Sequence, residues 1–379
     1  MNSSIRGSSS AGGSSSISGS STKPVTISSD EVELYDRQIR VWGLEAQNRL
    51  RNSDILIYGL TSLGAEVTKN LVLCGVRSVK LMDSADVTDA DVKSQFFLSS
   101  AELGTNRAES SQSKAQELNP MVKVEASAGA ILEQNEAFFK QFDLVILVDQ
   151  KHEANMQTNG ICRKHSIRFQ ACGVFGWTGY AFFDFNGFEF LVKKPPKPSA
   201  TVETTLDVDL MDVDGPSHSK SLPVAIECLD ISEEPEDLVE RKKVHFASYS
   251  DALNINWGLM KKYTRAMKRA VPQSYFPIKA LLEYWNKEEA TELDVEKLTA
   301  LWHAEIKRCN QDAEKHFVKP EKFMFFSNPQ LIPACAVVGG LVGQESIKAL
   351  SQNDCPLQNL FIYSALDSTS FVCDFPPRR

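Results

Sequence analysis

Residues 54–83 have the sequence DILIYGLTSLGAEVTKNLVLCGVRSVKLMD, and this stretch decides the fold. Its first apolar run ends in Gly59, which is typical of a buried parallel strand followed by a turn. Residues 65–74 predict a helix that ends at a glycine, and residues 76–83 predict a second strand that ends in an acid. Strand, turn, helix and strand in this order form one right-handed βαβ unit, as in the first half of a nucleotide-binding domain.

The turn of this unit departs from the dinucleotide fingerprint. The fingerprint has glycine at its first, third and sixth positions, the middle one so that the backbone can approach a pyrophosphate. Here these positions hold Gly59, Thr61 and Gly64. Because the side chain of Thr61 crowds the phosphate position, the turn favours a βαβ unit without a ligand of its own.

The composition is that of a soluble globular chain large enough for two domains or one elaborated domain. Its net charge of −8 argues against general binding to nucleic acid, and no apolar run reaches the ~20 residues of a membrane span. The eight cysteines are scattered without a CxxC pair, which argues against a zinc ribbon or a disulfide scaffold. We therefore expect no nucleic acid, no membrane and no metal among the partners of this chain.

Further strands and helices alternate after the first unit. Residues 142–149, FDLVILVD, predict a buried strand, and residues 167–172 predict another, followed by a glycine-rich turn at 173–179. This alternation predicts an α/β fold with a doubly wound, mainly parallel sheet.

Shifts in composition divide the chain. Ser and Gly dominate the first residues, and Pro, Ser and acids dominate a stretch after Lys193. We expect a disordered tail, two parts of the α/β domain, a flexible linker or insertion between them and a helical subdomain. The respective ranges are 1–29 for the tail, 30–192 and 321–379 for the α/β domain, 193–240 for the insertion and 241–320 for the helical subdomain.

Residues 31–50 predict a helix with a break at Gly43. Arg37 and Arg40 lie one turn apart in it and can share a face. For an isolated helix the simplest interpretation is two solvated arginines. The alternative is a guanidinium that is presented to a phosphate.

A cysteine and a short basic run each allow both a structural and a functional interpretation. Cys172, at a strand end, would be a nucleophile if a base such as His165 were oriented toward it, but a buried cysteine that fills apolar space is the favoured interpretation. The basic run 241–243 is either a weak nuclear-localisation element or a solvated strand entry.

The end of the chain predicts one helix and two strands. Residues 333–350 predict a helix rich in small residues. Small residues let another backbone come close, and an adjoining subunit would be a natural partner for this helix. The segments 360–364 and 370–375 predict two strands that pair as a hairpin.

Several stretches together resemble one family, the activating enzymes (E1) of ubiquitin-like proteins. Within it, their order and spacing are similar to the smaller subunits of heterodimeric SUMO-activating enzymes. The stretches are YDRQIRVWGLEAQ (35–47), the Gly59 turn, NRAE (106–109), LNP (118–120), VFG (174–176), CAVVGG (335–340) and QESIKAL (344–350).

The resemblance implies an adenylation fold that pairs with a similar domain of a larger subunit. In such pairs one half holds ATP and Mg²⁺ and carries the catalytic cysteine on its chain, and the other half lends an arginine from its N-terminal helix. Arg37 matches that arginine, and Arg40 is a second candidate contact. The resemblance therefore implies SUMO and the larger subunit as partners, no cofactor held by this chain itself, and a nuclear location, with some of the enzyme in the cytoplasm.

This chain departs from the half that holds ATP. That half carries Asn and, three positions later, Arg, where this chain has Asp91 and Ser94. Arg107 replaces a lysine, and residues 147–155 lack the Asn-Ala-x-Asp-Asn pattern of the third strand. A carboxylate at position 91 would repel a triphosphate. The departures predict a pocket that has lost its nucleotide.

Two alternatives remain open from the sequence. An NAD-dependent oxidoreductase on a Rossmann fold would use an acid for the ribose, which Asp83 fits, but Thr61 does not fit its turn. A regulatory subunit of another E1, such as that for NEDD8, would be expected to carry a larger helical insertion than this chain offers.

Overall fold

The computed structural model describes residues 26–193, 239–258, 271, 274–287, 293–316, 325–326, 330–366 and 368–374. Most of the expected tail (1–29) and of the expected insertion (193–240) lies outside these residues. No helix among the described residues has the length and apolar character needed to cross a bilayer.

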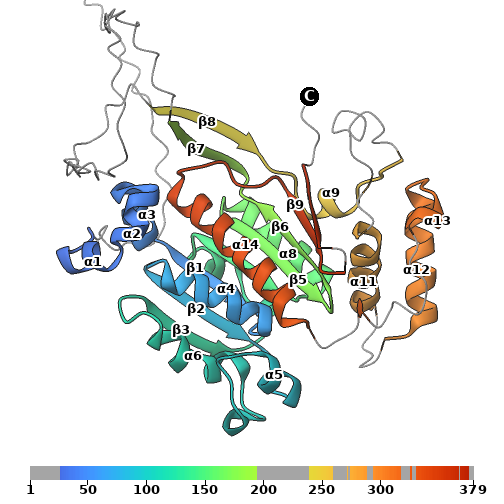
Figure 1. Ribbon diagram of the computed structural model, residues 1–379, viewed down its shortest axis with the longest axis horizontal. Coiled ribbons are helices and arrows are strands. Elements are labelled where there is room, and N and C mark those ends of the chain that lie inside the picture. Colours follow the sequence, from blue (N-terminus) through green and yellow to red (C-terminus); the bar gives the residue numbers. More distant parts are fainter. Residues whose placement is uncertain are drawn as a thin grey trace, which may run out of the picture.

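An eight-stranded sheet forms the centre of the molecule (Figure 1). Its strands are β1 (Asp54–Tyr58), β2 (Ser78–Asp83), β3 (Lys123–Ala128), β4 (Leu144–Val148), β5 (Arg168–Phe175), β6 (Thr178–Asp184), β9 (Leu360–Ser364) and β10 (Thr369–Cys373). The order is β10-β9-β6-β5-β4-β1-β2-β3. The pairs from β3 to β5 are parallel, and β5, β6, β9 and β10 pair antiparallel. The α/β class with a doubly wound, mainly parallel sheet is therefore confirmed.

The predicted βαβ unit is β1, α4 (Ser62–Leu73) and β2. A Cβ atom at Gly59, whose φ is +100°, would lie 2.2 Å from the carbonyl oxygen of Val148, and a Cβ atom at Gly64 would lie 2.0 Å from that of Gly59. Both glycines are required because backbone meets backbone there. Thr61 makes no such approach and instead caps α4, so the first and last glycines serve the fold while the middle position is free to change.

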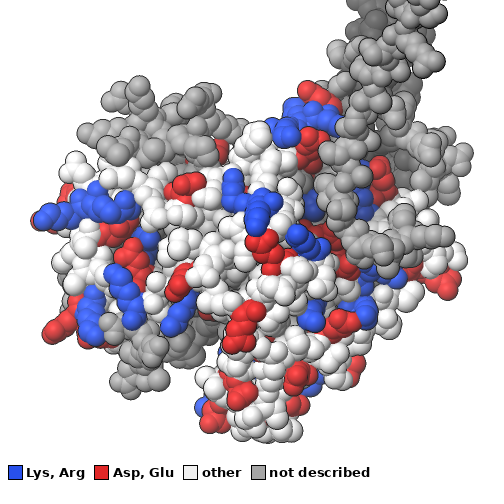
Figure 2. Space-filling view, turned by 180° about the vertical axis from the view of Figure 1, so that it is seen from behind, with Lys and Arg blue, Asp and Glu red and all other residues white. Residues whose placement is uncertain are grey.

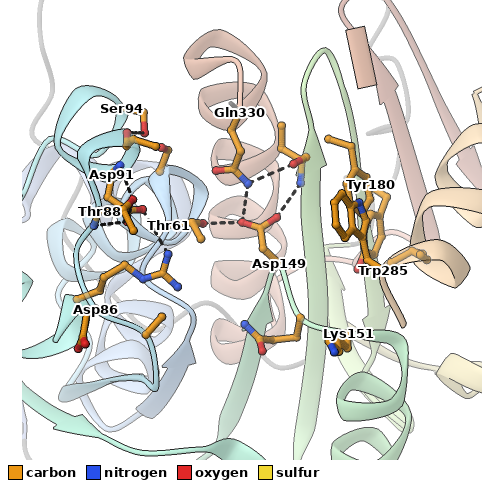
Figure 3. Close-up of a pocket in the computed structure, with 18 residues that line it drawn as sticks. Thr61, Asp86, Thr88, Asp91, Ser94, Asp149, Lys151, Tyr180, Trp285 and Gln330 are labelled. Atoms are coloured by element: carbon orange, nitrogen blue, oxygen red, sulfur yellow. Dashed lines mark hydrogen bonds and ion pairs between the residues drawn. The ribbon is translucent and has the colours of Figure 1, made fainter. Parts of the chain in front are cut away.

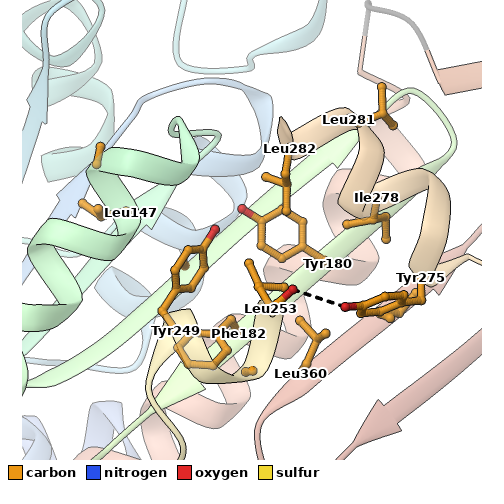
Figure 4. Packing of buried hydrophobic residues seen from close by; sticks show 14 of the residues in the cluster. Leu147, Tyr180, Phe182, Tyr249, Leu253, Tyr275, Ile278, Leu281, Leu282 and Leu360 are labelled. Carbon is orange, nitrogen blue, oxygen red and sulfur yellow. Dashed lines mark hydrogen bonds between the residues drawn. The ribbon is translucent and has the colours of Figure 1, made fainter. Parts of the chain in front are cut away.

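Helices cover both faces of the sheet. The alternating residues Ile55 and Ile57 of β1 pack in a core with α4, α6 (Arg107–Glu117) and α14 (Ile332–Ser351). The intervening residues Leu56 and Tyr58 belong to a second core with α8 (His152–Lys164), α9 (Tyr249–Leu253), α11 (Tyr275–Lys287) and α12 (Val295–Arg308). In Figure 4, side chains of α9 and α11 meet those of β6 and β9 in this second core.

Three short helices precede the sheet, α1 (Ser29–Leu34), α2 (Asp36–Trp42) and α3 (Leu44–Arg51). They confirm the helical prediction for residues 31–50 and the break at Gly43, which has a φ of +89°. Two further short helices are α7 (Glu136–Phe139) and α13 (Ala313–His316). In Figure 1, α1–α3 lie at one side of the molecule, away from α5 (Asp89–Ser94).

The glycine-rich segment 173–179 is not the long turn that its composition predicted. β5 continues through Phe175, and only Gly176 and Trp177 separate it from β6. Gly173 and Gly179 are strand residues, since a Cβ atom there would lie 2.8 Å from the ring of Tyr180 and 2.7 Å from Val338 respectively. These glycines make room for neighbouring side chains, which the local sequence did not reveal.

Two further pairs of strands are antiparallel. β9 and β10 pair antiparallel, which confirms the predicted C-terminal hairpin. β7 (Gly187–Lys193) pairs with β8 (Val239–His245) in a separate two-stranded sheet. β8 crosses the boundary that we expected at 240/241, and it contains the basic run 241–243, whose Lys243 forms an ion pair with Glu189.

Candidate functional site

A pocket of about 700 Å³ opens at the carboxyl ends of the parallel strands (Figure 3). The strand order reverses between β1 and β4 at this edge, which is where doubly wound sheets bind nucleotides. The volume is within the range of small-molecule sites. The pocket has a polar wall, with Thr61, Asp86, Asp91, Arg107 and Asp149, and an apolar wall, with Phe175, Tyr180, Leu282 and Trp285.

Thr61 has two hydrogen bonds within the chain. Its hydroxyl donates to the Asp149 carboxylate over 2.5 Å and accepts from the backbone N–H of Gly64 over 3.5 Å. The side chain therefore stands at the start of α4, where the fingerprint would place a glycine and a phosphate.

Asp149 is held by donors from three elements. Besides Thr61, the Val174 N–H donates to it over 2.9 Å and the Gln330 side-chain amide over 2.7 Å. Its φ of +54° turns the backbone at the end of β4. Burial raises the pKa of the Asp149 carboxyl, although these hydrogen bonds act in the opposite direction. The hydrogen bonds join the βαβ turn, β5 and the residues before α14 at one point.

Arg107 is engaged by two carboxylates of its own chain. Its guanidinium contacts Asp83 over 3.0 and 3.2 Å and Asp91 over 3.3 Å. Asp83 is buried and also accepts from the N–H groups of Leu60 over 2.6 Å and Ala85 over 2.9 Å. Burial opposes the charged form of Arg107, but the two carboxylates raise its pKa. The arginine thus compensates internal acids and is not presented to a ligand.

The polar wall does not suit a triphosphate. Asp91 and Ser94 line the pocket together with Arg107, at the positions that the resemblance to the activating enzymes assigned to the nucleotide pocket. The Ser94 hydroxyl donates to the Ala90 carbonyl over 2.8 Å, and Asp86 adds an exposed carboxylate. Arg107 is already paired, so this wall presents the carboxylates of Asp86 and Asp91 where phosphates would lie. Lys151, the residue before α8, is an exposed cation that also lines the pocket. The NAD alternative meets a similar obstacle, since both carboxylate oxygens of Asp83 already have partners.

Arg37 lies elsewhere, on α2. Its side chain is exposed, it does not line the pocket, and it forms no ion pair with any residue that the structure describes. Arg40 differs, since it pairs with Asp36 on the same helix over 3.0 and 3.1 Å. The two predicted arginines are therefore on one helix, but only Arg37 has its guanidinium unengaged by the described part of the chain.

Exposed apolar side chains lie on α1, α2, α4 and α14. Val41 on α2 is 79% exposed, Leu34 on α1 is 60% exposed, and Leu73 at the end of α4 is 44% exposed. Val337 on α14 is 43% exposed, and a second pocket of about 570 Å³ lies between α2, α4 and α14. Val41 and Leu73 both line this second pocket, so their exposed side chains lie together, and contiguous apolar surface is typical of sites where other proteins bind.

The remaining candidates have structural roles. Cys172 is fully buried, which raises the pKa of its thiol, and His165 instead contacts Glu136 over 2.7 Å. The apolar-filler interpretation of Cys172 therefore agrees with the structure. Among the described residues, no cluster of His, Cys, Asp and Glu side chains could hold a metal ion. On the face seen in Figure 2, the described positive and negative side chains are interspersed.

The sequence did not indicate how distant residues complete the pocket. Gln330 donates to Asp149, and Trp285 reaches the apolar wall from α11. Neither residue lies in a recognisable motif, and both come from segments far along the chain. Only the alternation of strands pointed to this edge, and it did not say which later segments would close it.

Comparisons with known proteins give a consistent result. Residues 35–379 match the ThiF family. The chain is 36% identical to SUMO-activating enzyme subunit aos-1 of Caenorhabditis elegans over 93% of this chain and 99% of that protein. It is also 36% identical to SUMO-activating enzyme subunit 1 of Xenopus tropicalis (91% of this chain, 96% of that protein) and of Homo sapiens (91% and 95%). Through these matches, the chain belongs to the ThiF family and, within it, to the SUMO-activating enzyme subunit 1 family.

Proposed function

We propose that this chain is the regulatory subunit of a heterodimeric SUMO-activating enzyme, in which the larger subunit holds ATP and Mg²⁺ and carries the catalytic cysteine. In this assembly the chain supports adenylation of the SUMO C-terminus, and Arg37 completes the partner's ATP site. The observation that carries the proposal is a contrast between two arginines. Arg107 in the chain's own pocket is paired with Asp83 and Asp91, whereas Arg37 is exposed on α2 without an ion pair among the described residues.

The chemistry of adenylation suits a guanidinium delivered from outside. The SUMO carboxylate attacks the α-phosphate, and pyrophosphate leaves, so negative charge builds up on phosphate oxygens. Arg37 would bind these oxygens and stabilise the transition state more than the ground state. An arginine is suited to this because it stays charged and donates two parallel hydrogen bonds.

The surroundings of Arg37 support delivery across an interface. Val41 lies one turn further along α2 on the same side as Arg37, Leu73 lines the same surface pocket as Val41, and Leu34 is exposed on the preceding helix. Covering these side chains with the larger subunit would remove apolar area from water and bring Arg37 to the contact. Arg40 is a secondary contact, because it must first leave Asp36.

The test is a set of substitutions in the assembled heterodimer. Arg37→Ala should lower SUMO-dependent ATP–pyrophosphate exchange by at least ~10²-fold, as expected for loss of a charged group at a transition state. Arg37→Lys should recover part of the loss, and Arg40→Ala should have a much smaller effect. Size-exclusion chromatography should show that all three variants still assemble, because the substitutions leave the fold and the apolar side chains near α2 unchanged.

A second measurement concerns the chain's own pocket. Isothermal titration of the isolated chain with Mg²⁺·ATP should give no stoichiometric binding, because the polar wall presents carboxylates. Tight 1:1 binding would refute the interpretation of the pocket. Unchanged exchange in the Arg37→Ala heterodimer would remove Arg37 from the mechanism.

A further inference from the structure

Tyr35, at the joint between α1 and α2, is the buried anchor of an otherwise exposed segment. It is 2% exposed, while Leu34 and Arg37 beside it face solvent. Its ring lies against Gly75, where a Cβ atom would be 2.5 Å from the Cζ atom of Tyr35. Gly75 has a φ of +80° and leaves the space that the ring occupies.

The hydroxyl of Tyr35 is also engaged. It accepts a hydrogen bond from the side-chain amide of Asn119 over 2.8 Å, and the same amide donates to the Val72 carbonyl over 2.9 Å. Asn119 is buried, and its own oxygen accepts from the Met121 N–H over 3.1 Å. The hydroxyl therefore ties the start of α2 to the end of α4 and to the segment that leads into β3.

The backbone of Tyr35 starts the helix that carries Arg37. The N–H groups of Gln38 and Ile39 both donate to the Tyr35 carbonyl over 2.9 Å. The side chain of Gln38, one turn after Tyr35, donates to the Leu73 carbonyl over 3.2 Å on the same side of the helix. With Tyr35 and Gln38 facing α4, helical geometry turns Arg37 away from the chain's own core.

We propose that Tyr35 is a positioning residue for Arg37. Its ring on Gly75 and its hydroxyl on Asn119 hold α2 in one orientation against α4, so that the Arg37 guanidinium reaches the partner's phosphates at a fixed distance and direction. The inference rests on the proposed role of Arg37. Catalytic groups must be held closely by their support, and a displacement of ~1 Å can cost ~10²-fold in rate.

The test is a double-mutant cycle in the assembled heterodimer. Tyr35→Ala removes the ring and the hydroxyl and should lower pyrophosphate exchange by ~10- to 100-fold. Tyr35→Phe keeps the ring and should have a smaller effect. Gly75→Ala should resemble Tyr35→Ala, because the added methyl group would occupy the space that the Tyr35 ring fills. In an Arg37→Ala background none of these changes should lower exchange further, since the group that they position is gone.

The matched control is Ile306→Ala, a buried residue of α12 in the core on the other face of the sheet. It lowers stability without touching α2, so any effect on exchange should be equal with and without Arg37. The KM for SUMO should be unchanged in the Tyr35 variants. Exchange is measured with excess enzyme so that the Arg37→Ala rate stays above background.

The outcomes separate the inference from the function on which it rests. If Arg37→Ala lowers exchange but Tyr35→Ala lowers it by the same factor in both backgrounds, Tyr35 is only structural and the inference fails. If Arg37→Ala has no effect, the proposed function itself fails. If Tyr35→Ala does not assemble, Tyr35→Phe and Gly75→Ala decide the question in the same cycle.

Discussion

Removing the guanidinium of Arg107 tests whether this arginine of the pocket wall is structural. Arg107→Ala deletes three contacts, two to Asp83 and one to Asp91, between 3.0 and 3.3 Å. Both acids are buried, and Asp83 is only 2% exposed. The substitution therefore leaves carboxylates in a site from which water is largely excluded.

The magnitude follows from that burial. Removing one partner of a buried ion pair costs ~3–5 kcal/mol, because the remaining charge has no compensation. Asp83 keeps the N–H donors of Leu60 and Ala85, which favours the lower part of this range. Combining Arg107→Ala with Asp83→Asn removes one of the two stranded charges and should recover part of the stability.

The assay is urea unfolding of the isolated chain, with Arg40→Ala as the matched control. Arg40 also pairs with an aspartate, but the two side chains are 77% and 50% exposed, so its loss should cost at most ~1 kcal/mol. If Arg107→Ala destabilises the chain no more than Arg40→Ala does, the carboxylates do not need the arginine. In that case Arg107 would be free to bind a phosphate, and the interpretation of the pocket would be wrong.

Two further predictions concern the docking of α1 and α14. Burial opposes ionisation of Glu31, but hydrogen bonds from Ser28 and Arg51 lower its pKa. The ionised Glu31 therefore contributes stability at neutral pH, and this contribution is lost as the pH falls below 4.5 through the folded-state pKa. Glu31→Gln should flatten this part of a pH–stability curve, and an unchanged curve would contradict the assignment. Gly339→Ala should destabilise the chain by ~1–3 kcal/mol in thermal unfolding, since its Cβ would lie 2.7 Å from that of Glu66. Gly340→Ala, in open space on the same helix, should instead add up to ~1 kcal/mol, and equal shifts for both would refute the packing argument.

The parts of the fold that depend on neighbouring residues were predictable from the sequence. The unit at 54–83 has its strand, turn and helix signals within one short window, and the structure has β1, α4 and β2 there. The segment 173–179 shows the limit. Its glycines suggested a turn, but Gly179 is small because Val338, from α14, packs against it. A contact between such distant segments leaves no signal in the local pattern.

In the candidate site, too, some residues were predictable from the sequence and others were not. Spacing from a known motif placed Asp91, Ser94 and Arg107 in the pocket, and all three line it. Their partners were not predictable, because the pairing of Arg107 with Asp83 depends on how α6 packs beside β2. The family resemblance also singled out Arg37, and the structure adds that Tyr35 beside it is buried and hydrogen-bonded to Asn119 while Arg37 faces solvent.

The changes in the pocket depend on one another. A buried carboxylate such as Asp149 needs a cation or hydrogen-bond donors, and here Thr61, the Val174 N–H and Gln330 supply the donors. Placing glycine at position 61 would therefore not by itself create a phosphate site. It would remove a donor from a buried acid while Asp91 still faced the phosphates. Because each of these residues supports another, creating a phosphate site here would require several substitutions at once, and in the proposed function the chain acts through Arg37, which lies outside the pocket.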